Sequence, residues 1–128
     1  MFEKLKKLLE NSYSPYSNFK VASIVVMKDG REFGGVNVEN ASYGAGICAE
    51  RSAILSAISS GYKKGDFKEM YVLTSGNKVS TSCFLCRQVM SELFEKKVPV
   101  HFYDLEGHQM DLLVEELCPY PFDSEDLK

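Results

Sequence analysis

The sequence contains no tryptophan, only two histidines and four prolines, and no long hydrophobic run. A helix that crosses a membrane needs about 20 consecutive apolar residues, so we predict no membrane segment and no membrane partner. The amino end, MFEKLKKLLE, carries too many charges for a secretory signal. These features together predict a cytoplasmic protein.

The chain also lacks an excess of positive charge. Its 15 Lys and Arg residues face 18 Asp and Glu residues, for a formal net charge of −3, and the lysines are mixed with acids. Domains that bind nucleic acid usually concentrate Lys and Arg on one face. We therefore expect no nucleic-acid partner, and a small-molecule ligand is favoured.

The spacing of apolar residues predicts one α/β domain over residues 1–128. Helical periodicity appears at 2–11, 48–60 and 83–95, and β-prone runs occur at 20–28, 31–38, 69–74 and 98–104. A last strand and a helical turn at 114–117 follow. Strands that alternate with helices favour a three-layer α/β/α sandwich, in which helices cover both faces of the sheet.

Cysteines are few but clustered. Four in 128 residues are too few for a disulfide scaffold, and in a reducing compartment clustered cysteines more often bind metal or perform redox chemistry. Cys83 and Cys86 are three residues apart and share one face of a predicted helix, while Cys48 opens another. Three thiolates suit a tetrahedral Zn²⁺ whose fourth position is left for water, which is the pattern of a catalytic site.

Two charged residues follow Cys48 directly. Glu50 points to a different side of the first helical turn, where it is available to water rather than to the metal. Arg51 is one turn from Cys48 and is predicted to donate to cysteine sulfur, which would offset the negative charge of three thiolates. Taken singly, Glu50 is a first-turn acid that suits the helix dipole and Arg51 a surface charge; their place beside Cys48 favours the catalytic interpretation.

Other reactive side chains have no such context. A lone Cys-x-x-Cys is most often structural zinc or redox, so the prediction depends on the pairing of the two motifs. Cys118 is predicted to be a packed thiol near the carboxyl end. His101 and His108 have no partner spacing and are predicted to be structural or solvated.

These residues resemble a known family. Cys-Ala-Glu at 48–50 with Cys-x-x-Cys at 83–86 is similar to the zinc nucleobase deaminases, in which a glutamate that is not a ligand acts as general acid and base. More closely, the chain resembles the small homotetrameric cytidine deaminases of nucleoside salvage. The resemblance runs from SPYSNF at 14–19 through NVENASYG, ICAERSAI and CRQV to PFDSEDL at 121–127.

The resemblance implies a fold with a five-stranded mixed sheet, one Zn²⁺ per chain, and a tetramer with shared active sites. It implies hydrolysis of cytidine or deoxycytidine to uridine or deoxyuridine plus ammonia, in which zinc-bound hydroxide attacks C4 and Glu50 shuttles the proton. Asn37 and Glu39 would bind the ribose hydroxyls, Phe19 would stack on the pyrimidine, and the backbone at Ala49 would bind its amide edge. Tyr43 would line the site near a subunit boundary, and Phe122 would cover the base from a neighbouring subunit.

The sequence also departs from the family. Ser82 stands where proline is usual, Phe84 and Leu85 replace small residues, and Ala22-Ser23 stands where Gly-Ala is usual. Three alternatives stay open at this point. They are deamination of an aminoacyl-nucleoside antibiotic, as in blasticidin deaminases; a nucleic-acid editing deaminase; and a non-catalytic zinc-stabilised module. Glu39 argues against the first, low net charge and short loops against the second, and the presence of Glu50 against the third.

Overall fold

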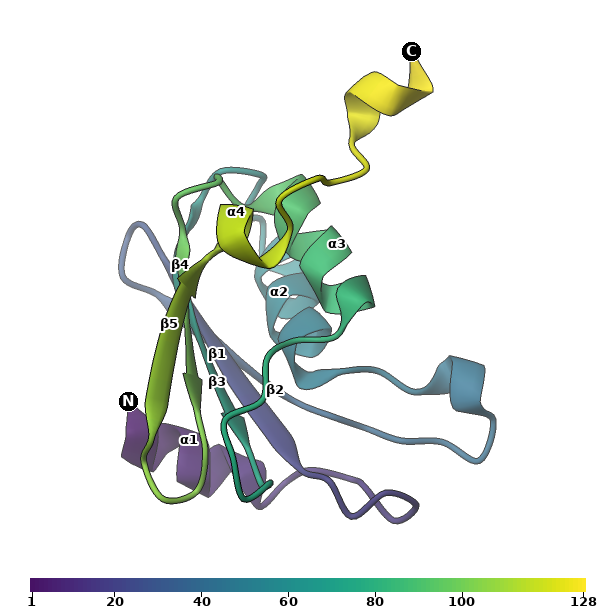
Figure 1. The fold of residues 1–128 in the computed structure, drawn as a ribbon, viewed down its shortest axis with the longest axis vertical. Helices are drawn as coiled ribbons and strands as arrows, with labels where there is room; N and C mark the ends of the chain where they lie inside the picture. The colour runs from purple at the N-terminus through teal and green to yellow at the C-terminus, as the bar shows by residue number, and fades with distance from the viewer.

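Five strands form one mixed sheet in the computed structural model, which describes residues 1–128 (Figure 1). The strands lie in the order β2-β1-β3-β4-β5. Their bounds are β1 (Val21–Met27), β2 (Glu32–Val36), β3 (Phe67–Thr74), β4 (Pro99–Tyr103) and β5 (Gln109–Leu113). Only β3 and β4 are parallel, and the helix between them makes the crossover that parallel strands require.

Helices cover both faces of the sheet, which confirms the predicted three-layer α/β/α fold. The helices are α1 (Phe2–Leu9), α2 (Ala49–Ser59), α3 (Phe84–Leu93) and the short α4 (Val114–Leu117), with 3₁₀ turns at Tyr43–Ala45 and Ser124–Leu127. In Figure 1, α1 lies on one side of the sheet and α2 and α3 lie on the other. None of the helices combines the length and the apolar character needed to cross a membrane.

The alternation of side chains along the strands explains the two layers. On β1, Ala22 and Ile24 pack with Leu5 and Leu9 of α1, whereas Val25 belongs to the larger core beneath α2 and α3. Successive side chains of a strand point to opposite faces. Because β1 and β3 are apolar on both faces, they occupy the middle of the sheet.

Gly35 allows β2 to lie directly against α2. A Cβ atom built on Gly35 would be 2.5 Å from the backbone nitrogen of Ala53 and 2.7 Å from the backbone oxygen of Ala49. No side chain fits at those distances, so glycine is required by the close approach of the two backbones. This contact fixes the height of α2 over the sheet.

The expected elements are present, with shifts of a few residues at their ends. The first helix ends at Leu9 rather than 11, the second strand ends at Val36, and the third begins at Phe67. Cys48 and Cys83 are the N-cap residues of α2 and α3. A cysteine therefore directly precedes the first residue of each of these two helices.

Candidate active site

The three predicted zinc ligands converge, although Cys48 is 35 positions from Cys83 in the chain. The sulfur atoms of Cys48, Cys83 and Cys86 all lie within 4.8 Å of one another. Cys48 and Cys83 come from the N-caps of α2 and α3, and Cys86 lies one turn into α3, where it is fully buried. The two helix starts thus bring two distant motifs to one point.

The geometry of the cluster fits zinc. Two sulfurs on a tetrahedral zinc with Zn–S distances of about 2.3 Å lie about 3.8 Å apart. The Sγ atoms of Cys48 and Cys83 are 3.6 Å apart. The donor set is three thiols with no fourth protein ligand in the group, which matches a zinc site that keeps one position for water.

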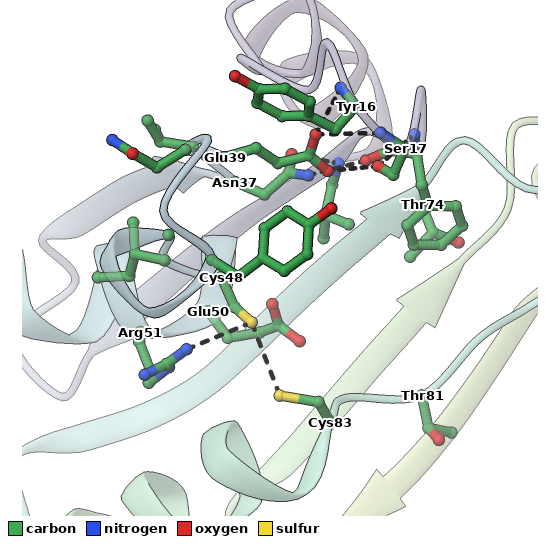
Figure 2. Close-up of a pocket in the computed structure, with 17 residues that line it drawn as sticks. Tyr16, Ser17, Asn37, Glu39, Cys48, Glu50, Arg51, Thr74, Thr81 and Cys83 are labelled. Atoms are coloured by element: carbon green, nitrogen blue, oxygen red, sulfur yellow. Dashed lines mark hydrogen bonds between the residues drawn. The ribbon is translucent and has the colours of Figure 1, made fainter.

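The surroundings of the cluster favour a thiolate. A hydrogen bond from Cys86, with further help from Arg51, lowers the pKa of Cys48 to about 5. Nη2 of Arg51 lies 3.5 Å from Sγ of Cys48 (Figure 2), as expected from the sequence. Hydrogen bonding to Cys48 and burial raise the pKa of Cys86. A positive ion at this point would stabilise the remaining thiols as thiolates.

Glu50 is buried beside the cysteines, with 5% of its surface exposed. Burial raises the pKa of its carboxyl group, and the hydroxyl of Ser82 acts in the opposite direction. In Figure 2 the carboxyl group lies near the sulfur of Cys48 and projects into the pocket, and it is not one of the clustered ligands. A carboxyl group in such a position can exchange a proton with a molecule held beside the cluster.

A pocket of about 610 Å³ opens above the cysteines. Its volume is in the range of small-molecule sites. It lies where β1 begins and β3 ends, since Val21 pairs with Thr74 and both line it. The predicted residues that line it are Phe19, Asn37, Glu39, Tyr43, Cys48, Glu50, Arg51 and Cys83.

Glu39 is held as a carboxylate at the rim of the pocket. It accepts hydrogen bonds from the backbone N–H groups of Tyr16 and Ser17, at 3.0 and 3.1 Å, and from the Ser17 hydroxyl (Figure 2). The Ser17 hydroxyl and these N–H groups lower the pKa of Glu39, although its burial opposes them. A carboxylate can accept further hydrogen bonds from ligand hydroxyls.

Asn37 is largely occupied by the protein itself. Its Nδ2 donates to the Phe19 carbonyl at 2.8 Å, and its Oδ1 accepts from the backbone N–H of Val21 at 2.9 Å and from the Ser12 hydroxyl. One hydrogen on Nδ2 is left for a ligand. The sequence predicted that Asn37 contacts a ligand. The structure adds that its hydrogen bond to the Phe19 carbonyl fixes the backbone of Phe19.

Three predicted site residues, Ala49, Phe122 and Tyr43, are not enclosed by the pocket of the single chain. Ala49 is fully buried in the first turn of α2, directly after Cys48. Phe122 lies outside the pocket, on the segment after α4, and is 57% exposed. Tyr43 does line the pocket, yet 86% of its surface is exposed. The predicted roles of Tyr43 and Phe122 across a subunit boundary stay predictions, and so does the predicted contact of the Ala49 backbone with the base.

The residues predicted to lie outside the site do so. Cys118 is half-buried after α4 and is not part of the cysteine cluster. His101 lies between Asp111 and Glu69, at 2.6 and 3.0 Å, and His108 contacts Asp104 at 2.8 Å. Both histidines therefore pair with acidic side chains, in agreement with a structural role.

Sequence reasoning missed several residues of the pocket. Tyr16 and Ser17 hold Glu39, and Thr74 and Thr81 also line the pocket (Figure 2). Tyr16 and Ser17 belong to the segment SPYSNF, so the motif contained a signal for them. Thr74 had none, because only the register of β3 against β1 brings it to the pocket.

Known proteins share both the sequence and the fold. Residues 1–102 match the family model described as the cytidine and deoxycytidylate deaminase zinc-binding region. The chain is 40% identical over 118 residues to a cytidine deaminase of Halalkalibacterium halodurans, covering 92% of this chain and 88% of the relative. It is 35% identical over 117 residues to a cytidine deaminase of Mycoplasma genitalium, covering 91% and 88%. The crystal structure of a cytidine deaminase from Burkholderia pseudomallei superposes with a TM-score of 0.90 at 40% identity, covering 94% of this chain and 95% of that one.

Proposed function

The chain belongs to the cytidine and deoxycytidylate deaminase family, and on that premise we propose that it is a zinc-dependent cytidine deaminase of pyrimidine salvage. The substrate is cytidine, deoxycytidine or both. Water adds at C4 of the base, the bond from C4 to the exocyclic nitrogen breaks, and uridine or deoxyuridine leaves with ammonia. The observation that carries this proposal is the cluster of three cysteine sulfurs beside a buried glutamate at the floor of a pocket.

Cys48, Cys83 and Cys86 would hold the metal. When bound, zinc supplies a Lewis acid that makes water nucleophilic near neutral pH. Arg51 stabilises the negative sulfur of Cys48 through the contact at 3.5 Å. The first N–H groups of α2 and α3 have no partner within their helices and add to this effect, because they carry partial positive charge.

Glu50 is proposed to move the proton. Its carboxylate accepts a proton from the attacking water and delivers it to the exocyclic nitrogen, which then leaves as ammonia. The burial that raises the pKa of Glu50 favours this role, because a shuttle works best when its pKa is near the working pH.

The remaining pocket residues would bind the nucleoside. Glu39 offers a carboxylate to the paired hydroxyls of a ribose, and Asn37 offers one free N–H. Phe19, which is 38% exposed at the pocket, would stack on the pyrimidine. The backbone N–H of Ala49 has no partner within α2, because the first N–H groups of a helix have none, and would bind the polar edge of the base.

Cytidine turnover together with metal content tests the function. We expect one zinc per chain, loss of cytidine absorbance and stoichiometric ammonia. Glu50→Gln preserves the size of the side chain, so zinc content should stay at one per chain while kcat falls by about 10² to 10⁴-fold, the usual contribution of general acid–base catalysis. A Glu50→Gln variant as fast as the parent would refute the proton role, and turnover of an aminoacyl-nucleoside antibiotic in place of cytidine would refute the substrate.

We also propose a homotetramer with shared sites. Support comes from exposed apolar side chains: Tyr120, Phe122 and Leu127 lie on the C-terminal segment, and Phe84 and Leu85 on the first turn of α3. That segment extends away from the body of the chain in Figure 1, and exposed apolar patches mark interaction surfaces. Light scattering should give about four times the chain mass of 14.4 kDa. A monomer with full cytidine turnover would contradict the shared site.

The cytoplasmic location remains part of the proposal. Support comes from the four cysteines, all of which are free, because reducing compartments such as the cytoplasm keep thiols from forming disulfides.

A further inference from the structure

The segment that leads to Cys83 has no backbone hydrogen bonds of its own. Residues 76–82 connect the end of β3 to the start of α3, and none of them donates or accepts a backbone–backbone hydrogen bond. The segment nevertheless carries Thr81, which lines the pocket, and Ser82, which is 4% exposed and faces Glu50. Something other than secondary structure must hold it in place.

The side chain of Arg87 donates two hydrogen bonds to this segment. Its Nε donates to the Ser82 carbonyl and its Nη2 to the Thr81 hydroxyl, both at 2.8 Å. The third nitrogen, Nη1, donates to the Leu117 carbonyl at the end of α4, at 3.0 Å. The guanidinium also lies over the ring of Phe84, 4.5 Å from its centroid.

These contacts fix the guanidinium from four sides. Arginine presents its donors in a rigid planar fork, so three simultaneous hydrogen bonds set both its position and its orientation. Arg87 lies one turn after Cys83 on α3, and its backbone N–H donates to the Cys83 carbonyl at 3.0 Å. The same residue therefore ties the helix, the metal ligand at its start and the segment before it into one rigid unit.

We propose that Arg87 is a positioning residue for the metal centre, one that holds residues 81–82 so that Cys83 and the pocket wall at Thr81 stay in the geometry that zinc and substrate require. Arg87 touches neither the metal cluster nor the pocket; it acts through the segment that it holds. The inference rests on the proposed zinc-dependent function and goes beyond it, because it assigns a residue outside the ligand set.

Arg87→Lys is the direct test, since lysine keeps the charge but cannot present three donors in a plane. The readouts are the rate of zinc release to an excess of a chromophoric chelator, kcat and KM for cytidine, and the thermal unfolding temperature. We expect zinc release to become 10 to 100 times faster, the usual consequence of losing an outer partner of a metal ligand. The value of kcat should fall by a similar factor while KM changes less than threefold.

Two further variants make the test specific. Thr81→Val removes only the acceptor of Nη2, so it should speed zinc release by a smaller factor and add little when combined with Arg87→Lys, because the two changes break the same network. Arg31→Lys is the matched control. Arg31 also lies over a phenylalanine ring, Phe33, at 4.8 Å, but donates no side-chain hydrogen bond, so zinc release and turnover should equal those of the parent.

The proposal is overturned when Arg87→Lys lowers the unfolding temperature but leaves zinc release and kcat within twofold of the parent. That result would make Arg87 a stabilising residue only. Should Arg87→Lys fail to fold, Thr81→Val decides the matter, and unchanged zinc release would overturn the proposal. A parent protein that binds zinc but does not deaminate cytidine would refute the proposed function instead, while the release rates would still test Arg87.

Discussion

Replacing Gly35 by alanine should disturb the metal centre from the far side of α2. The added Cβ would meet the backbone nitrogen of Ala53 at 2.5 Å, the backbone oxygen of Ala49 at 2.7 Å and the Cβ of Ser52 at 2.8 Å. Two of these atoms belong to the helix backbone, so no side-chain rotation relieves the overlap. To restore an ordinary contact of 3.4 Å, α2 must move away from β2 by about 0.9 Å.

The magnitude follows from this displacement. Overpacking of a well-packed interior costs about 1–3 kcal/mol. Alanine in a strand returns about 0.5–1 kcal/mol relative to glycine, which leaves a net loss of stability of about 1.3 kcal/mol. An unfolding entropy of about 2.1 cal/mol/K per residue gives about 270 cal/mol/K for 128 residues. The unfolding temperature should therefore fall by about 5 °C.

Activity should fall as well. Cys48 and Glu50 begin α2, so a shift of the helix displaces both relative to Cys83. Displacements of about 1 Å can reduce a rate about 100-fold. The assays are differential scanning fluorimetry at fixed zinc concentration, because bound metal raises the apparent stability, and the initial rate with cytidine.

Gly34→Ala is the control within the same strand. Gly34 faces α1 rather than α2, and its Cβ would meet a methyl group of Leu8 at 3.0 Å, at the end of a flexible side chain that can turn aside. Its unfolding temperature and rate should stay close to those of the parent. If Gly35→Ala behaves like Gly34→Ala in both assays, the inference that this contact sets the position of α2 is wrong.

Two further predictions concern single contacts. Ser17→Ala removes a hydroxyl that donates to Glu39 and accepts from the Phe19 backbone N–H. KM for cytidine should therefore rise by up to about tenfold, while kcat changes less than twofold. An unchanged KM in steady-state assays would contradict the role of Glu39. The hydrogen bond to Asp104 raises the pKa of His108, so its stabilisation is complete below about pH 6.5 and is lost as the pH rises through the folded-state pKa. The difference in unfolding temperature between the parent and His108→Asn should therefore be largest near pH 5.5 and shrink towards pH 8; a difference that grows with pH would refute the pairing.

The metal cluster could be predicted from the sequence because its information is local. Cys-x-x-Cys places two sulfurs on one helix face, and Cys48 heads a second helix, so the alternation of strands and helices was enough to suggest that the two meet. The three-layer fold follows from the same alternation. These features depend on spacing and period, which the sequence displays directly.

Other features depend on distances that no local pattern encodes. Asn37 is occupied by the backbone of Phe19 and Val21 because the segment that enters β1 packs against the end of β2. The contact at Gly35 depends on the separation of β2 from α2. From the sequence alone, a glycine in a strand indicates only a low strand propensity, so it does not predict this contact. The hydrogen bonds from Arg87 reach backward to a segment without regular structure, where spacing rules give no guidance.

The position of the cysteines carries a cost that helps to explain the site. Cys48 and Cys83 occupy N-cap positions, and neither side chain caps its helix. Serine, threonine, aspartate or asparagine would each stabilise a helix start by about 1 kcal/mol relative to such a residue. Both helices leave their first N–H groups uncapped by a side chain at the one point where three sulfurs meet. An uncapped helix start favours negative charge. The first backbone N–H groups of α2 and α3, which a capping side chain would otherwise bind, are therefore left to stabilise the thiolates that would hold the metal.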